Sequence, residues 1–290
     1  MRRGQNAWAA VVAGMAGVLL ASLPPQARAA DPAPVIAAER KFAADGAANG
    51  VKASFLRAMA KDAVVFAPGP VNAKAFYSKR PAGKGAHVLT WWPTYAGLSA
   101  SGEFGFTTGP YAIDGQRGGW FFTVWVRQAD GTWKWIFDDG TESDAAAGPP
   151  PTAPVEPLNE ARWLPDSSRA AMVLARKAEA KLAAGAKTDL AGAYAEALSY
   201  DARVQGSSAA PAMGPEAVAD ELARRPKQVV FTPKGGRAAG AGDLVFTYGE
   251  ARWTEAGRPR SGHYARFWRS DLAGFRIVFD QLVPTPEPAK

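Results

Sequence analysis

The sequence predicts an α+β protein made of two tandem domains, each with N-terminal helices packed on one face of a mainly antiparallel sheet. At 290 residues the chain is long enough for two domains of common size. A proline-rich stretch from Gly148 to Pro157 divides it, and similar segments recur on both sides. In each half, helical spacing comes first and strand-like segments follow, an order typical of α+β domains.

Two pairs of segments carry the repeat. Ser99 to Tyr111 matches Gly240 to Arg252, so that Gly102-Glu103 corresponds to Gly242-Asp243. Gly119 to Gly140 matches Gly262 to Leu282, and this match pairs Trp125 with Trp268 and Asp138 with Asp280. The Arg80-Pro81 pair likewise matches Arg225-Pro226. We therefore expect a first domain over 30–147, a stiff extended linker over 148–165 and a second domain over 166–283.

Helices are predicted from apolar spacing and from capping residues. Apolar residues from Ala171 to Leu182 recur at helical spacing, with N-cap candidates at Asp166 to Ser168 and a stop at Gly185. Two shorter helices are expected on either side of Gly46 to Gly50. Short helices over Asn72–Lys79 and Pro215–Arg224 occupy matching places, and proline suits a first helical position.

Strands are predicted after these helices. In the first half the candidates are Val88–Trp92, Phe104–Thr108, Phe121–Arg127 and Trp133–Asp138. Gly118-Gly119 and Asp130-Gly131 are the expected hairpin turns, because glycine accepts a positive φ there.

The first 29 residues have the pattern of a signal peptide. Arg2 and Arg3 precede an apolar run from Ala7 to Leu23, and Ala27-Arg28-Ala29 offers a small-x-small cleavage site. The sequence thus predicts a periplasmic or secreted protein that has no membrane association once residues 1–29 are removed. The last residues, 284–290, are expected to form a disordered tail.

Composition and charge exclude several classes of function. Without Arg2, Arg3 and Arg28, 31 of the 34 basic residues remain against 27 acidic ones, so the net charge falls from +7 to +4. Neither half has a basic stripe, and a nucleic-acid partner is therefore not expected. The absence of cysteine excludes disulfides and thiolate metal sites, and two histidines cannot supply a three-histidine site. We expect no metal and no cofactor.

The segment from Phe122 to Asp138, FTVWVRQADGTWKWIFD, and its weaker echo from Ala265 to Asp280 carry a family resemblance. Together with the preceding helices, they resemble the nuclear-transport-factor-2-like superfamily, in particular its SnoaL-like and ketosteroid-isomerase-like branches. The resemblance covers nearly all of the chain after residue 29, taken as two copies. It implies two cone-shaped domains, each with a curved sheet wrapped against helices and a pocket at the wide end. The superfamily includes isomerases, cyclases, dehydratases and members without known chemistry, so the fold does not fix the function.

Polar residues at matched strand ends are the candidate catalytic groups. Asp138 and Asp280 end the last strands, and in an apolar cone their pKa would be raised, which suits a base or a neutral donor. The alternative is an ordinary strand-end carboxylate facing water. Strand alternation places Tyr264 and Arg266 on one face and His263 on the other. Tyr264 could therefore share a pocket with Asp280, with His263 and Arg266 as further ligand-binding candidates.

Aromatic residues crowd the first half, and core packing is their ordinary explanation. Because adjacent residues of a strand face opposite sides, one of Trp91 and Trp92 is expected to line a cavity or an interface. A pocket for an apolar or ring-shaped ligand would use Trp91, Trp92, Trp120 and Trp135.

Three functions remain open. We favour an exported protein that binds a small apolar molecule or an envelope partner without catalysis. The first alternative is a cofactor-free isomerase, cyclase or dehydratase that uses Asp280 with Tyr264, or Asp138 among the tryptophans. The second is a structural role, with the two halves packed sheet to sheet as a pseudo-dimer within a monomer.

Overall fold

The computed structural model describes residues 30–83, 85–143, 148–206 and 210–286. The first unit begins with α1 (Ala33–Asn49) and α2 (Val51–Ala58), and α3 (Ala73–Ser78) follows two strands later. Its strands are β1 (Met59–Phe66), β2 (Pro70–Asn72), β3 (Leu89–Trp91), β4 (Tyr95–Leu98), β5 (Phe104–Ile113), β6 (Gln116–Arg127), β7 (Trp133–Glu142) and β8 (Glu156–Pro157). They form one sheet in the order β2-β1-β7-β6-β5-β4-β8, with β3 also paired to β5.

The second unit repeats this plan. Its helices are α4 (Ser168–Gly185), α5 (Leu190–Ala197) and α6 (Pro215–Arg224). Its sheet has the order β10-β9-β14-β13-β12-β11, built from β9 (Leu198–Gln205), β10 (Ala212–Met213), β11 (Val230–Ala238), β12 (Leu244–Glu255), β13 (Arg258–Asp271) and β14 (Gly274–Pro284). In both sheets the strand after the second helix runs parallel to the last long strand, and the long strands pair antiparallel. The predicted α+β fold of two tandem domains is confirmed.

The strand pairings allow single residues of the first unit to be matched with single residues of the second. Thr123 lies opposite Asp138 between β6 and β7, and Arg266 lies opposite Asp280 between β13 and β14. We call two residues equivalent when the pairings place them alike in this way. The turns before β5 and β12 match in the same way. The backbone hydrogen bond from Ser99 N–H to the Phe104 carbonyl corresponds to the one from Ala239 N–H to the Leu244 carbonyl.

Local sequence explains where the helices begin and end. Gly50 separates α1 from α2 at φ 82°, a conformation that glycine adopts without strain. The Asn72 side chain caps α3, and the Ser167 side chain caps α4 by accepting from Ala170 N–H. α4 ends at Gly185 and α6 spans Pro215 to Arg224, as the sequence predicts.

One predicted turn is wrong. Gly118 and Gly119 lie inside β6, where the pairing with β5 shifts by a residue and forms a bulge. The hairpin turn falls instead at Asp114-Gly115, with φ of 51° and 78°. An Asp-Gly pair suits a tight hairpin turn, because both of its central positions need positive φ.

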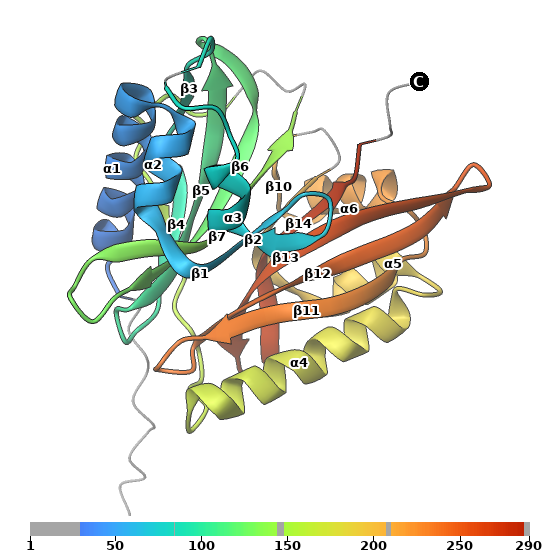
Figure 1. Cartoon of the computed structure of the whole chain (residues 1–290). Coiled ribbons are helices and arrows are strands. Elements are labelled where there is room, and N and C mark those ends of the chain that lie inside the picture. The colour runs from blue at the N-terminus through green and yellow to red at the C-terminus, as the bar shows by residue number, and fades with distance from the viewer. Residues whose placement is uncertain (1–29, 84, 144–147, 207–209, 287–290) are drawn as a thin grey trace, which may run out of the picture.

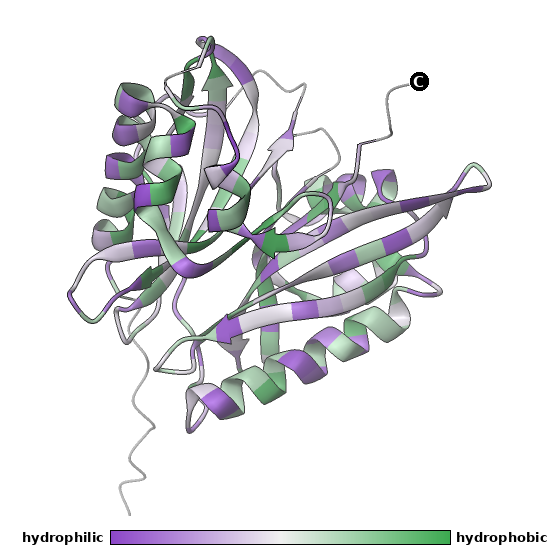
Figure 2. Cartoon of the chain, viewed as in Figure 1, coloured by the Kyte–Doolittle hydropathy of each residue, from purple (hydrophilic) through white to green (hydrophobic). Residues whose placement is uncertain are grey.

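The two units pack through the faces of their sheets that the helices leave uncovered. Figure 1 shows α1 and α2 on the outer side of the first sheet and α4 on the outer side of the second. Hydrophilic and hydrophobic residues alternate along α1 and α4 in Figure 2, as expected for helices with one buried face. Between the sheets lies an aromatic core from both units, in which Phe122 stacks on Phe279 at 4.0 Å between ring centroids. Strands of the second sheet are therefore buried on both faces, and residues 263–270 of β13 are all buried.

Reciprocal hydrogen bonds show that the two units meet about a pseudo-twofold axis. Asp243 accepts from Ala100 N–H at 2.8 Å, and Glu103, the equivalent of Asp243, accepts from Gly240 N–H at 2.6 Å. Such exchange of equivalent contacts is the mark of an isologous interface. The arrangement is an internal pseudo-dimer.

The segment predicted as a stiff extended linker, 148–165, contributes a short strand to the first sheet. Within it, β8 pairs in parallel with β4, and Leu158 is buried in the core between the sheets. The predicted signal peptide, residues 1–29, lies outside the described residues, as does the end of the predicted tail, residues 287–290. Across the described residues, no helix is both long and apolar enough to span a membrane.

Candidate functional site

A cavity of about 310 Å³ opens in the first unit between its sheet and the helices α2 and α3. Aromatic side chains from α2, α3, β3, β5 and β6 form most of its wall: Phe55, Phe76, Tyr77, Trp91, Tyr111 and Phe121. The carboxylates of Asp138 and Asp139 on β7 line the same space. This volume is at the lower end of the usual range for small-molecule pockets.

Asp138 is one of the polar residues that line this cavity. It keeps some accessible surface because it faces the cavity, although protein atoms surround it on every side. Burial raises the pKa of Asp138, the nearby Glu39 carboxyl raises it further, and the hydrogen bond from Thr123 Oγ1 at 2.9 Å lowers it. The carboxyl is thereby biased toward its neutral form, which can donate a hydrogen bond.

Glu39 belongs to α1, and its side chain is fully buried in the core of the first unit. Its carboxyl accepts from the indole N–H of Trp91 at 2.6 Å and of Trp125 at 2.9 Å, and from Thr107 Oγ1 at 2.5 Å. Burial raises the pKa of Glu39, and these three donors oppose the shift. Thus, in the part of the chain that the structure describes, neither Asp138 nor Glu39 has a basic side chain bonded to its carboxyl.

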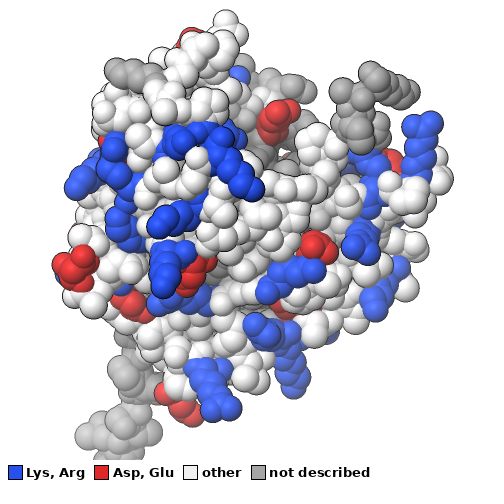
Figure 3. Space-filling model, in the orientation of Figure 1, with Lys and Arg blue, Asp and Glu red and all other residues white. Residues whose placement is uncertain are grey.

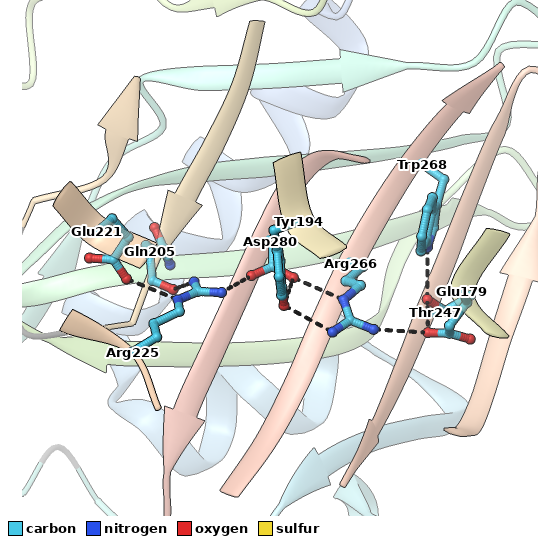
Figure 4. A network of polar contacts seen from close by, with 9 residues as sticks. All are labelled: Glu179, Tyr194, Gln205, Glu221, Arg225, Thr247, Arg266, Trp268 and Asp280. Carbon is cyan, nitrogen blue, oxygen red and sulfur yellow. Dashed lines mark hydrogen bonds and ion pairs between the residues drawn. The ribbon is translucent and has the colours of Figure 1, made fainter. Parts of the chain in front are cut away.

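The second unit holds the equivalent carboxyls in a different way, as Figure 4 shows. Glu179 on α4 and Asp280 on β14 are both buried, and Arg266 lies between them. Its Nε donates to Asp280 at 2.9 Å, and its Nη1 lies 3.5 Å from Glu179. Arg266 takes the place that Thr123 has in the first unit.

A second guanidinium reaches Asp280 from the end of α6. Arg225 Nη1 donates to Asp280 at 2.6 Å, and its Nη2 donates to the Gln205 carbonyl at 2.7 Å. Tyr194 from α5 donates its hydroxyl proton to Asp280 at 2.9 Å. Asp280 therefore has both oxygens engaged by the protein itself, and the space beside it is filled by side chains.

The structure does not bring the predicted pair Tyr264 and Asp280 into contact. Both are buried on the helix-facing side of the sheet, but Arg266 lies between them, with its guanidinium carbon 4.0 Å from the Tyr264 ring centre. Burial raises the pKa of Tyr264 above its usual range. A reaction at Asp280 with Tyr264 as partner therefore lacks room for a substrate.

His263 faces the other side of β13, as alternation predicts, and contacts the first unit. Its Nε2 lies 2.5 Å from Asp139 Oδ2, which also accepts from Gln281 at 2.6 Å. The imidazole stacks on Phe66 at 4.0 Å between ring centres. Because Phe66 and Asp139 line the cavity, the second unit supports one wall of it.

Of the four predicted pocket tryptophans, only Trp91 lines the cavity. Trp135 is buried behind it against Phe42 and Phe55. Trp92 follows the end of β3, and its indole N–H donates to the Pro149 carbonyl at 3.0 Å. Trp120 is buried next to Gly148.

Basic residues surround the outside of the cavity. Figure 3 shows Lys and Arg gathered over the face that carries α2 and α3. Among them Arg80 lines the mouth, where its guanidinium lies over the rings of Phe76 at 5.1 Å and Tyr77 at 5.4 Å. Its backbone carbonyl accepts from Lys52 at 2.6 Å. Its equivalent by sequence, Arg225, turns inward instead.

Several functional groups escape prediction from the sequence. Glu39, Thr123, Glu179, Tyr194 and Arg225 all belong to the buried polar clusters, and none is among the predicted site residues. The spacing of the repeat could have found the two glutamates, because they occur at matching places in two helices that each have an apolar face. The direction of the Arg225 side chain depends on the conformation of the chain at the end of α6, which residue spacing does not encode.

No protein-family model matches the chain, and no curated protein matches it. Solved structures similar to parts of it include a ketosteroid isomerase-like protein from Erwinia carotovora (13% identity, TM-score 0.36), which covers 40% of this chain and 96% of that one. An NTF2-like protein of unknown function from Pseudomonas putida (13% identity, TM-score 0.36) covers 43% of this chain and 92% of that one. A protein of unknown function with a cystatin-like fold from Nostoc punctiforme (11% identity, TM-score 0.34) covers 40% and 92%.

Proposed function

We propose that the protein binds a small, largely apolar molecule in the cavity of its first unit. The observation that carries this proposal is the 310 Å³ space whose aromatic walls enclose the half-buried, hydrogen-bonding carboxyl of Asp138. Apolar walls with a few placed polar groups are what small-molecule sites have in common. The second unit serves as a partner that covers the first sheet and holds Asp139 through His263.

A neutral ring compound tests this proposal. We expect benzyl alcohol to bind, detected by ligand-observed NMR. Leu89→Trp should abolish binding, because Leu89 lines the cavity and a larger side chain fills it. Val230→Trp places the same side chain on the exposed surface of β11 and should leave binding unchanged. Binding that survives Leu89→Trp would contradict the proposal.

A second candidate uses the same carboxyl as a catalytic acid or base. The raised pKa of Asp138 favours it, because a carboxyl shifted toward neutrality suits proton transfer near physiological pH. Exchange of the α-hydrogens of a ring-bearing ketone for deuterium, followed by NMR, tests this candidate. Catalysis requires exchange that Asp138→Asn removes, and binding alone requires none.

Location and partners are also part of the proposal. The pattern of residues 1–29 supports export and a periplasmic or secreted protein. The internal pseudo-dimer supports a monomer, because the sheet faces by which such units could pair are already covered. An envelope protein as a partner stays a prediction.

A further inference from the structure

We propose that the ligand of this cavity is a small organic cation, an amine, amidine or guanidine on a ring-sized apolar group, with its charge against Asp138. This inference rests on the proposed function and names the chemical class of the ligand. It comes from comparing the cavity with the same region of the second unit, where the protein supplies such a cation itself.

In the second unit, the guanidinium of Arg266 lies among aromatic rings. Its central carbon is 4.2 Å from the centre of the Phe231 ring and 4.0 Å from that of Tyr264. The same guanidinium bonds Asp280 at 2.9 Å and Tyr194 at 2.9 Å. Ring faces and a carboxylate together form the surroundings that desolvated organic cations prefer.

The first unit keeps these surroundings and lacks the arginine. The strand pairings make Trp91 the equivalent of Phe231 and Phe121 the equivalent of Tyr264, and both line the cavity. Asp138 is the equivalent of Asp280. At the position of Arg266 stands Thr123, a short, uncharged and fully buried side chain whose hydroxyl bonds Asp138. The rings and the acid are therefore retained where the internal cation is not.

The acidic groups inside the cavity favour a cation over an anion, because a cation bound beside Asp138 stabilises the ionised form of this carboxyl. Asp138 and Asp139 line it, Glu39 lies behind Asp138, and Arg80 is the cationic group in its lining. Arg80 is exposed and lies at the mouth over Phe76 and Tyr77, so water screens its charge. Asp139 already pairs with His263 and Gln281, which leaves Asp138 as the carboxyl available to a ligand.

Three probes of one size and different charge separate the possibilities. Benzamidine carries the cation, benzyl alcohol is neutral and benzoate is an anion, and a ring of this size fits, since benzene occupies a cavity of about 150 Å³ elsewhere. Titration calorimetry at pH 7.5 should show benzamidine binding at least tenfold more tightly than benzyl alcohol, with benzoate the weakest. Equal or tighter binding of benzyl alcohol or benzoate would overturn the cation inference and leave the proposed function standing. Absence of binding by all three would overturn both.

Variants assign the preference to Asp138. Asp138→Asn should reduce benzamidine affinity at least tenfold and leave benzyl alcohol within about threefold. Thr123→Arg should place a guanidinium in the first unit where Arg266 stands in the second. This variant should abolish benzamidine binding. Asp220→Asn removes one carboxylate from the exposed surface of α6 and is the matched control. If Thr123→Arg does not fold, Asp138→Asn decides alone, and unchanged benzamidine affinity in that variant contradicts the inference.

Discussion

Thr123 of β6 and Arg266 of β13 occupy equivalent positions in the two sheets, each opposite an aspartate of the last long strand. The arginine neutralises Asp280 and approaches Glu179, whereas the threonine hydroxyl gives Asp138 one hydrogen bond. One substitution between repeats thus accompanies a filled polar core in the second unit and a cavity in the first. The two units have the same fold and differ in what stands beside this aspartate.

Removing the internal cation should destabilise the second unit. Arg266→Thr leaves Glu179 and part of Asp280 buried without their positive partner, and breaking a buried ion pair in this way costs about 3–5 kcal/mol. We expect a loss of that size in urea unfolding. Arg252→Thr, at a side chain that is 75% exposed, should change stability by less than about 0.5 kcal/mol. A small loss in Arg266→Thr would mean that Arg225 alone satisfies the carboxylates.

Asp138 should make stability fall as pH rises. Folding raises the pKa of Asp138, so the folded protein binds the proton more tightly than the unfolded chain does. In the unfolded chain the pKa of an aspartate is about 3.9. The free energy of unfolding therefore declines from that pH up to the folded pKa and is level above it. Asp138→Asn should be more stable than the wild type at pH 7 and equal to it below about pH 4. If the difference in unfolding free energy between Asp138→Asn and the wild type does not grow as pH rises, Asp138 is ionised in the folded protein without cost.

The aromatic core between the sheets should make the two units unfold together. Phe279 is fully buried and stacks on Phe122 of the other unit at 4.0 Å, and a buried Phe→Ala change costs about 3–5 kcal/mol. We expect Phe279→Ala to lower the midpoint of one shared calorimetric transition. Two separated transitions in the wild type would contradict the pseudo-dimer.

The reciprocal contacts at the interface should differ in strength. Asp243 is 4% exposed and accepts from Ser99 Oγ at 2.6 Å and from Ala100 N–H at 2.8 Å. Asp243→Ala leaves these donors unpaired, at an expected cost of about 1–3 kcal/mol. Glu103→Ala removes the single bond to Gly240 N–H from a more accessible side chain, so a smaller loss is expected in chemical denaturation. A larger loss for Glu103→Ala would contradict this ranking.

The repeated framework could be predicted because it depends on local patterns. Helix caps such as Asn72 and the Asp138/Asp280 match depend on residues that are close in sequence or at a constant spacing. The predicted turn at Gly118-Gly119 is wrong because a second turn-forming pair, Asp114-Gly115, stands four positions earlier and fits the hairpin better.

The site could be predicted only in part, because its chemistry depends on contacts across the fold. The sequence singles out Asp138 and Trp91, but Glu39 contacts Thr107 across 68 residues, and His263 contacts Asp139 across 124. Whether Arg266 serves a ligand or the protein's own acids depends on its distance to Asp280, which strand alternation alone does not give. Alternation correctly places Tyr264 and Arg266 on one face, yet it says nothing of their order within the core.

The central claim is that the first unit has an accessible cavity and the equivalent region of the second is filled. ¹⁹F NMR of protein labelled with 5-fluorotryptophan tests it directly, with Trp91 and Trp268 assigned from their Phe variants. On adding benzyl alcohol, the resonance of Trp91 should shift in a saturable way while that of Trp268 stays in place. A saturable shift at Trp268, or none at Trp91, would contradict the account.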